Sequence, residues 1–152
     1  MGQSHSLVFE HRSVIAAPLE RVWSFHQSAD ALHRLTMPPM RIQIVRDDRR
    51  SLTGGELEFL LRLGPLSVRW VAAHAPGPEP MSFMDRQVVG PLAFWEHEHI
   101  MRPHEDGTEL LDRVSLVYHP GPRYFWTRLV FSRPALRTLF AYRHWRTRRA
   151  VR

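Results

Sequence analysis

A pattern of period two runs through residues 83–101, which read FMDRQVVGPLAFWEHEHIM. Successive side chains of a β-strand point to opposite faces of the sheet, so every second residue shares a face. We therefore expect two strands joined around Gly90-Pro91, a dipeptide that favours a turn. The aligned faces of this predicted hairpin collect Phe83, Asp85, Gln87, Trp95, His97, His99 and Met101.

These faces mix large hydrophobic side chains with an acid, an amide and two imidazoles. A strand that packs on a dry core normally turns its apolar residues inward and its polar residues outward. The alternate positions of the hairpin, among them Arg86, Glu96 and Glu98, form the more charged set. The mixture therefore predicts a cavity with polar groups in its wall rather than a dry core.

Two short helices are expected after a first strand. Residues 7–15 are rich in the side chains that favour strands. Pro18 suits the first turn of a helix, and Ser28 has the side chain of an N-cap for a second helix. Pro38-Pro39 ends that second helix. The buried stripe expected on the first helix consists of Leu19, Val22, Trp23 and His26.

Further hairpins and one long helix are expected in the rest of the chain. Ser132 and Pro134 mark the start of the helix, whose apolar stripe includes Leu136, Leu139 and Phe140. Consecutive hairpins imply an antiparallel sheet, and a curved sheet covered by a helix leaves space between the two. The further strands are expected within residues 42–44, 57–63, 66–74 and 108–118, where apolar residues alternate with polar ones.

Length and composition indicate a single domain spanning residues 1–152. No apolar run reaches the roughly 18 residues of a membrane-spanning helix. The segment Met1 to Ser6 lacks the apolar core of a signal peptide, so the cytoplasm is the expected location. The chain has no cysteine, which excludes disulfides, thiolate nucleophiles and zinc sites built on cysteine.

All 21 basic residues are arginine. Without lysine the chain cannot form a Schiff base on a side-chain amine or a Walker A phosphate site. The net charge of +6 can attract nucleic acid or anionic lipid. However, arginine fills ordinary surface positions in a chain that has no lysine. We therefore expect no nucleic-acid partner and no stable membrane insertion.

The alternating residues of the hairpin form a recognisable sequence signature. Four segments elsewhere in the chain support this signature: Ala17-Pro18, Trp70, Asp112-Arg113-Val114 and Tyr142-Arg143-His144. Together these residues resemble the START-like, or SRPBCC, superfamily of helix-grip proteins, and within it the bacterial polyketide cyclase/dehydrase-like, ligand-binding branch. The signature is Phe83-x-Asp85-x-Gln87-x-x-Gly90-Pro91-x-x-x-Trp95-x-His97-x-His99.

The resemblance implies an α+β helix-grip fold. About seven antiparallel strands would form a curved sheet wrapped on the C-terminal helix, with an interior cavity and two short helices after the first strand. Members of the superfamily bind hydrophobic ligands such as lipids, sterols and polyketides, and some are cyclases or hydrolases. A shared fold does not fix a function, so the activity is left open.

Three interpretations of the polar residues are open. His97 or His99 could act as a general base oriented by Asp85, which would make these three the candidate catalytic residues. The same three side chains could hold a metal. Alternatively, Asp85, Gln87, His97 and His99 could satisfy one another as a buried network. Two histidines two residues apart are a short signal, so we expect no metal and no cofactor.

The function predicted from the sequence is binding of a small hydrophobic or amphipathic ligand in the cavity between the sheet and the C-terminal helix. Trp70, Phe83 and Trp95 would supply the apolar wall. Asp85, Gln87, His97 and His99 would orient the polar end of the ligand. One alternative is a cyclase, dehydratase or hydrolase that uses His97 or His99 as acid or base. The other is an interaction module without a ligand.

Overall fold

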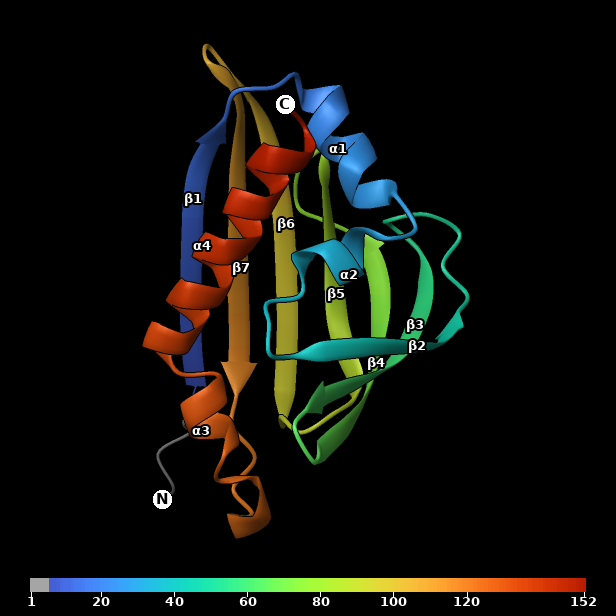
Figure 1. The fold of residues 1–152 in the computed structure, drawn as a ribbon, viewed down its shortest axis with the longest axis vertical. Coiled ribbons are helices and arrows are strands. Elements are labelled where there is room, and N and C mark those ends of the chain that lie inside the picture. The colour runs from blue at the N-terminus through green and yellow to red at the C-terminus, as the bar shows by residue number, and fades with distance from the viewer. Residues whose placement is uncertain (1–5) are drawn as a thin grey trace.

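One sheet of seven antiparallel strands dominates the computed structural model, which describes residues 6–152 (Figure 1). The strand order is β1-β7-β6-β5-β4-β3-β2, which confirms the expected antiparallel α+β fold. The N-terminal residues 1–5, which the sequence marks as polar, lie outside the described part. The strands are β1 (Ser6–Ile15), β2 (Arg41–Asp47), β3 (Gly55–Leu63), β4 (Leu66–Pro76), β5 (Ser82–Val89), β6 (Phe94–His104) and β7 (Gly107–Val117).

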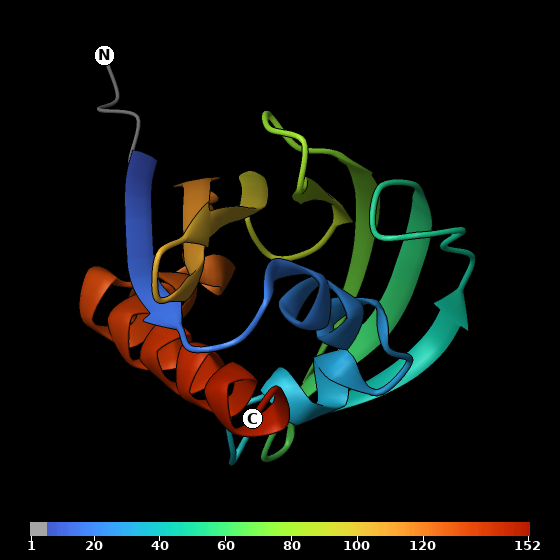
Figure 2. The ribbon, with the colours of Figure 1, turned by 90° about the horizontal axis from the view of Figure 1, so that it is seen from above.

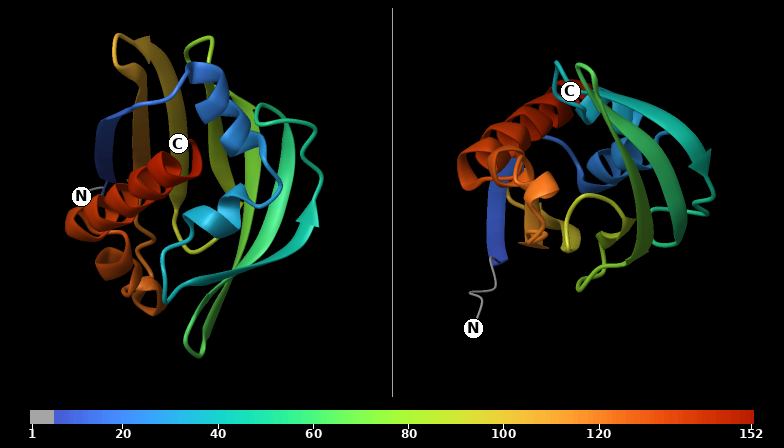
Figure 3. Two further views of the ribbon diagram at one scale, coloured as in Figure 1. Left: turned by 45° about the horizontal axis from the view of Figure 1, so that its top comes forward. Right: turned by 90° about the horizontal axis from the view of Figure 1, so that it is seen from below.

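Helices cover the concave side of this sheet (Figure 2). The long helix α4 runs across the open side, and α1 and α2 lie beside it, as both views of Figure 3 show. No helix within residues 6–152 combines the length and the apolar character needed to cross a membrane. The helical segments are α1 (Leu19–Gln27), α2 (Ala31–Leu35), the 3-10 turn η1 (Pro122–Tyr124), α3 (Thr127–Val130) and α4 (Arg133–Ala150).

The first two helices differ in detail from the sequence-based expectation. Val22 and His26 are buried as expected, but Phe25 is the third buried residue of α1 and Trp23 is only half-buried. Ser28 does not cap α2. Its hydroxyl donates a 2.6 Å hydrogen bond to the carbonyl of Phe25 and so satisfies the end of α1, while α2 begins after Asp30.

The central hairpin aligns the faces that the sequence predicts. Across β5 and β6, Phe83 lies opposite His99 and Asp85 lies opposite His97. Since directly opposed residues point to the same side of a sheet, the acid and both imidazoles share the concave face. On the other face Arg86 pairs with Glu96, in keeping with the more charged character of the alternate positions.

The long helix packs along β1 and β7. Its N-cap is Ser132, whose hydroxyl oxygen accepts a 3.4 Å hydrogen bond from the amide of Ala135. Leu136 and Phe140 are fully buried, and the Phe140 ring lies 5.7 Å from that of Phe9 on β1. The same buried stripe continues with His144, so a polar ring enters the core where an apolar residue is the usual choice.

Candidate functional site

A cavity of about 480 Å³ lies between the concave face of the sheet and the helices. Most of its wall is apolar, and β4, β5 and β6 contribute an acid and three imidazoles to it. Its size falls in the range of pockets that hold small organic ligands, roughly 300 to 1,000 Å³. The apolar wall includes Leu35, Leu57, Phe59, Leu61, Trp70, Phe83, Trp95, Phe131 and Leu139.

Aromatic rings form one half of the wall. The Trp70 ring is stacked over Phe59 at 6.2 Å between centroids and stands perpendicular to Trp95 at 5.5 Å. Phe131, which follows α3, lies 5.6 Å from Trp95 and closes this group from the helical side. Edge-to-face and stacked contacts of this kind hold rings in fixed orientations. Trp70 and Trp95 thus occupy the wall positions expected from the sequence.

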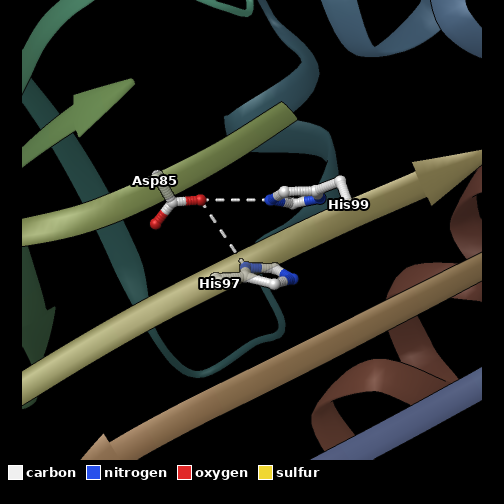
Figure 4. A group of neighbouring side chains, drawn as sticks. All are labelled: Asp85, His97 and His99. Carbon is white, nitrogen blue, oxygen red and sulfur yellow. Dashed lines mark hydrogen bonds and ion pairs between the residues drawn. The ribbon is translucent and has the colours of Figure 1, made fainter. Parts of the chain in front are cut away.

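The polar half of the cavity is built on three side chains that point toward one another (Figure 4). Oδ2 of Asp85 lies 3.1 Å from Nε2 of His99 and 3.6 Å from Nδ1 of His97. The His99 ring is also stacked on Phe83, with centroids 4.1 Å apart and planes 9° apart. Asp85 keeps 17% of its side-chain surface exposed because it faces the cavity, whereas both imidazoles are almost fully buried.

A second carboxylate, Asp112 on β7, lies behind the two imidazoles. Its Oδ1 accepts from Nε2 of His97 at 2.6 Å and lies 3.1 Å from Nδ1 of His99. Its Oδ2 accepts from Nε2 of His144 on α4 at 2.6 Å. The hydroxyl of Ser13 on β1 lies 2.5 Å from Nδ1 of His144. One carboxylate therefore links the sheet, the helix and the cavity wall.

Both carboxyl groups stay ionised because the imidazoles surround them. Burial acts to raise the pKa of Asp85, but the hydrogen bond with His99 and the nearby charge of His97 outweigh it and lower the pKa. Burial likewise opposes ionisation of Asp112, yet its hydrogen bonds with His144, His97 and His99 hold its pKa well below the ordinary value. Hydrogen bonds to the charged form of an acid have this effect.

The two imidazoles of β6 respond in opposite directions. Burial and the neighbouring His99 lower the pKa of His97 to about 4, although the hydrogen bond with Asp112 opposes this change. Burial also acts to lower the pKa of His99, but its contacts with Asp112 and Asp85 outweigh burial and raise the pKa. The surroundings thus favour the charged form of His99 more than that of His97.

Two further histidines line the polar half. Nδ1 of His26 donates to the carbonyl of Val22 at 2.9 Å, and Nδ1 of His74 donates to the carbonyl of Leu52 at 3.2 Å. In each ring the other nitrogen is left as an acceptor. Burial lowers the pKa of both rings, that of His26 to about 4. Both residues therefore offer neutral acceptor nitrogens to the cavity.

Gln87 lies outside the cavity wall, in contrast to the other site residues expected from the sequence. Its amide nitrogen donates to the carbonyl of Leu92 at 2.8 Å, and its amide oxygen accepts from the Leu92 amide at 3.1 Å. Leu92 is buried in the core, so Gln87 satisfies a backbone that water does not reach. The other six ligand contacts expected from the sequence do line the cavity: Trp70, Phe83, Asp85, Trp95, His97 and His99.

Asp112 and His144 are the residues of the polar network that reasoning from the sequence missed. Asp112 alternates with the buried Leu110 and Val114, and a carboxylate among apolar residues on one strand face is a visible signal. His144 continues the helical stripe of Leu136 and Phe140 at a spacing of four. Each pattern marks a buried polar residue but does not name its partner.

The cavity reaches the surface beside α4. Pro39 and Thr138 both line the cavity and are exposed, which locates the opening between the segment after α2 and the first half of α4. Further along α4, Arg143 also lines the cavity, and its guanidinium carbon lies 5.5 Å from the centre of the Phe140 ring. The wall formed by α4 therefore includes a cationic side chain.

Comparisons with known proteins show the fold. No protein-family model and no curated protein sequence matches the chain. Among solved structures, an aromatase/cyclase from Streptomyces sp. R1128 matches with a TM-score of 0.61 and 16% identity, over 97% of this chain and 92% of that one. A Thalictrum norcoclaurine synthase matches with a TM-score of 0.63 and 13% identity, over 96% of this chain and 97% of that one.

A third match is to part of a longer chain. A nucleoside-diphosphate sugar epimerase from Corynebacterium glutamicum matches with a TM-score of 0.62 and 27% identity, over 94% of this chain but only 28% of that one. The same architecture thus occurs both as nearly the whole of a chain and as a segment of a larger protein. The three matches agree on the layout of sheet and C-terminal helix described above.

Proposed function

We propose that this chain, which has the helix-grip fold of the START-like/SRPBCC superfamily, binds a small hydrophobic or amphipathic molecule in its internal cavity. The observation that carries the proposal is the cavity of about 480 Å³, which is apolar over most of its wall and polar at one side. Specific small-molecule sites typically combine a large apolar wall with a few convergent polar groups.

In this proposal the apolar and the polar parts of the cavity wall contact different parts of the ligand. The rings of Trp70, Phe83 and Trp95 supply the apolar surface that favours transfer of the ligand from water. Asp85, His97 and His99 contact its polar end and fix its orientation. Gln87, which the sequence includes among the ligand contacts, instead holds the turn that positions β5 and β6.

A second candidate function is catalysis of the cyclase or dehydratase type. Its supporting observation is that Asp112 engages one nitrogen of His97 and one of His99, which leaves the other nitrogen of each ring on the cavity side. All three matched structures are enzymes by name, and two of them, an aromatase/cyclase and a norcoclaurine synthase, are covered over nearly their whole length. Binding is preferred because both free nitrogens converge on Asp85 rather than on open space.

Occupation of the cavity can be tested with the amphipathic fluorophore 1-anilinonaphthalene-8-sulfonate. Ala135 of α4 lines the cavity, whereas Ala141 on the same helix is exposed. We expect saturable binding of one fluorophore per chain and loss of affinity by roughly tenfold or more in Ala135→Trp, because the indole fills the space. The matched control Ala141→Trp should bind as the unmodified protein does.

Equal affinity in both tryptophan variants, with both folded by circular dichroism, would contradict binding inside the cavity and support an interaction module without a ligand. If the fluorophore does bind inside the cavity, native mass spectrometry of protein purified from its own host identifies the natural ligand. With that ligand in hand, His97→Ala separates the two candidate functions. Loss of turnover with retained binding indicates an enzyme, and altered affinity without turnover indicates a binding protein.

A further inference from the structure

We propose that Asp85, His97 and His99 form a site for one divalent transition-metal ion in the cavity wall, with Asp112 as the residue that orients both imidazoles. The proposal differs from the absence of a metal expected from the sequence, since the sequence does not reveal Asp112 behind the two rings. It does not rest on binding of an organic ligand and can hold whether or not that binding occurs.

The first argument is the spacing of the donor atoms. One donor atom from each of Asp85, His97 and His99 lies within 4.8 Å of the others. Oδ2 of Asp85 is 3.1 Å from Nε2 of His99 and 3.6 Å from Nδ1 of His97. Metal bonds of about 2.0 to 2.2 Å in tetrahedral geometry place neighbouring donors about 3.3 to 3.6 Å apart. The separation between Asp85 and His97 lies within that range, and the separation between Asp85 and His99 is slightly shorter.

The second argument is independent and concerns the protons of the two rings. Asp112 Oδ1 lies 2.6 Å from Nε2 of His97 and 3.1 Å from Nδ1 of His99, so one nitrogen of each ring is engaged behind the cavity wall. The other two ring nitrogens, Nδ1 of His97 and Nε2 of His99, face Oδ2 of Asp85, and a cation would replace the proton that His99 shares with Asp85. Each of these three atoms can offer a lone pair to a cation bound between them.

Charge gives the third argument. Two carboxylates, Asp85 and Asp112, contact the same two imidazoles in a buried network. A divalent ion carries the charge that balances two carboxylates. A carboxylate that accepts from metal-bound imidazoles is also the usual arrangement around such sites, because it fixes the ring orientation and raises the basicity of the ligand nitrogen.

The donor set indicates the class of ion. Two imidazole nitrogens and one carboxylate oxygen suit zinc, iron and neighbouring transition metals better than magnesium or calcium, which prefer oxygen donors throughout. All three residues line the cavity, so the remaining coordination position faces the cavity space. A site with three protein ligands and one open position can accept the polar atom of a bound molecule.

The test uses the full chain without an affinity tag, freed of metal by a chelator and then titrated separately with Zn²⁺ and Co²⁺. We expect uptake of one equivalent of each ion by calorimetry, and a visible absorption band of the Co²⁺ form that reports bound nitrogen ligands. Absence of saturable uptake in the unmodified protein would overturn the proposal, whatever the behaviour of the variants.

Four variants locate the ion. Asp85→Asn and His99→Ala should each lower the affinity at least about 100-fold, and Asp112→Asn should lower it about 10- to 100-fold and shift the Co²⁺ band, as expected for a positioning residue. The control His33→Ala removes an exposed imidazole of α2 and should change nothing. Binding that survives both Asp85→Asn and His99→Ala would overturn the proposal, and its loss in His33→Ala would assign the ion to the surface.

Discussion

Nε2 of His144 lies 2.6 Å from Oδ2 of Asp112, and this hydrogen bond joins the long C-terminal helix to β7. Both side chains are almost completely buried. The other oxygen of the carboxylate contacts the two imidazoles of β6. Asp112 consequently joins the sheet and the helix by buried polar contacts immediately behind the cavity wall.

Replacement of Asp112 by asparagine should destabilise the fold by about 2 to 4 kcal/mol. The amide has one accepting oxygen, so its NH2 group would face an N–H donor of either His144 or the β6 histidines. A buried N–H donor without an acceptor destabilises the fold by most of the hydration free energy that the donor lost on burial. Urea unfolding of Asp112→Asn and the unmodified protein, both with a chelator present, measures the difference.

The adjacent residue supplies the control. Arg113 is on the opposite face of β7, where its guanidinium pairs with Glu10 and Glu98. Since exposed ion pairs contribute little, Arg113→Gln should cost no more than about 1 kcal/mol. A larger effect of Arg113→Gln than of Asp112→Asn would contradict the assignment of the buried carboxylate as the main polar tie.

The Ser13–His144 contact predicts a fixed tautomer. Because Nε2 of His144 donates to Asp112, its Nδ1 must accept the proton of the Ser13 hydroxyl, 2.5 Å away. Ser13→Ala should therefore cost about 1 kcal/mol and leave the tautomer unchanged. Nitrogen NMR of the imidazole distinguishes the two forms, and a proton on Nδ1 of His144 would show that the hydrogen bond runs the other way.

Gly90 and Gln87 should behave as a coupled pair. A methyl group on Gly90 would meet Oε1 of Gln87 at 2.2 Å and displace the amide from Leu92. Gly90→Ala and Gln87→Ala should each cost about 1 to 3 kcal/mol, because each leaves the buried Leu92 backbone without its partners. In the double variant the costs should not add, since both changes remove the same contacts.

Urea unfolding of the two single variants and the double variant gives the coupling directly. Strictly additive costs would mean that Gly90 is required for some other reason than the space taken by Gln87. Gly64, around which a Cβ would meet open space, is not a suitable reference because its backbone has a positive φ. Gly54 has open space and no such restriction, so Gly54→Ala serves as the control.

The parts of the fold that the sequence predicted are those governed by local rules. Alternation along residues 83–101 and a turn around Gly90-Pro91 were sufficient to place Asp85, His97 and His99 on one face of a hairpin, while the exact pairing of Asp85 with His97 comes from the structure. The helix after Ser132 follows from its cap and from the apolar spacing of Leu136 and Phe140. The second short helix was misplaced at its start because the Ser28 hydroxyl satisfies the preceding helix instead.

The parts that escaped prediction depend on contacts between distant segments. Asp112 lies opposite His99 in the pairing of β6 with β7. That register follows from the position of the turn at Asp106-Gly107, which lies several residues away from both side chains. No local rule connects His144 with Asp112, because the helix reaches β7 only through packing. Gln87 has the correct alternation for the cavity face but finds its partners in the turn, where long side chains can bend back.

The pairing of β1 with β7 has a consequence for the order of folding. Ser6 lies opposite Val117 and Ile15 opposite Thr108, so β1 can pair only after β7 has been synthesised. Contacts of such long sequence separation form slowly, whereas the consecutive hairpins from β2 to β7 close over short loops. Since α4 contacts both β1 and β7, the wall behind the cavity forms only after α4 has been synthesised. A nascent chain that still lacks α4 therefore has no closed cavity, and a molecule that occupies the cavity can stabilise only the state in which α4 is in place.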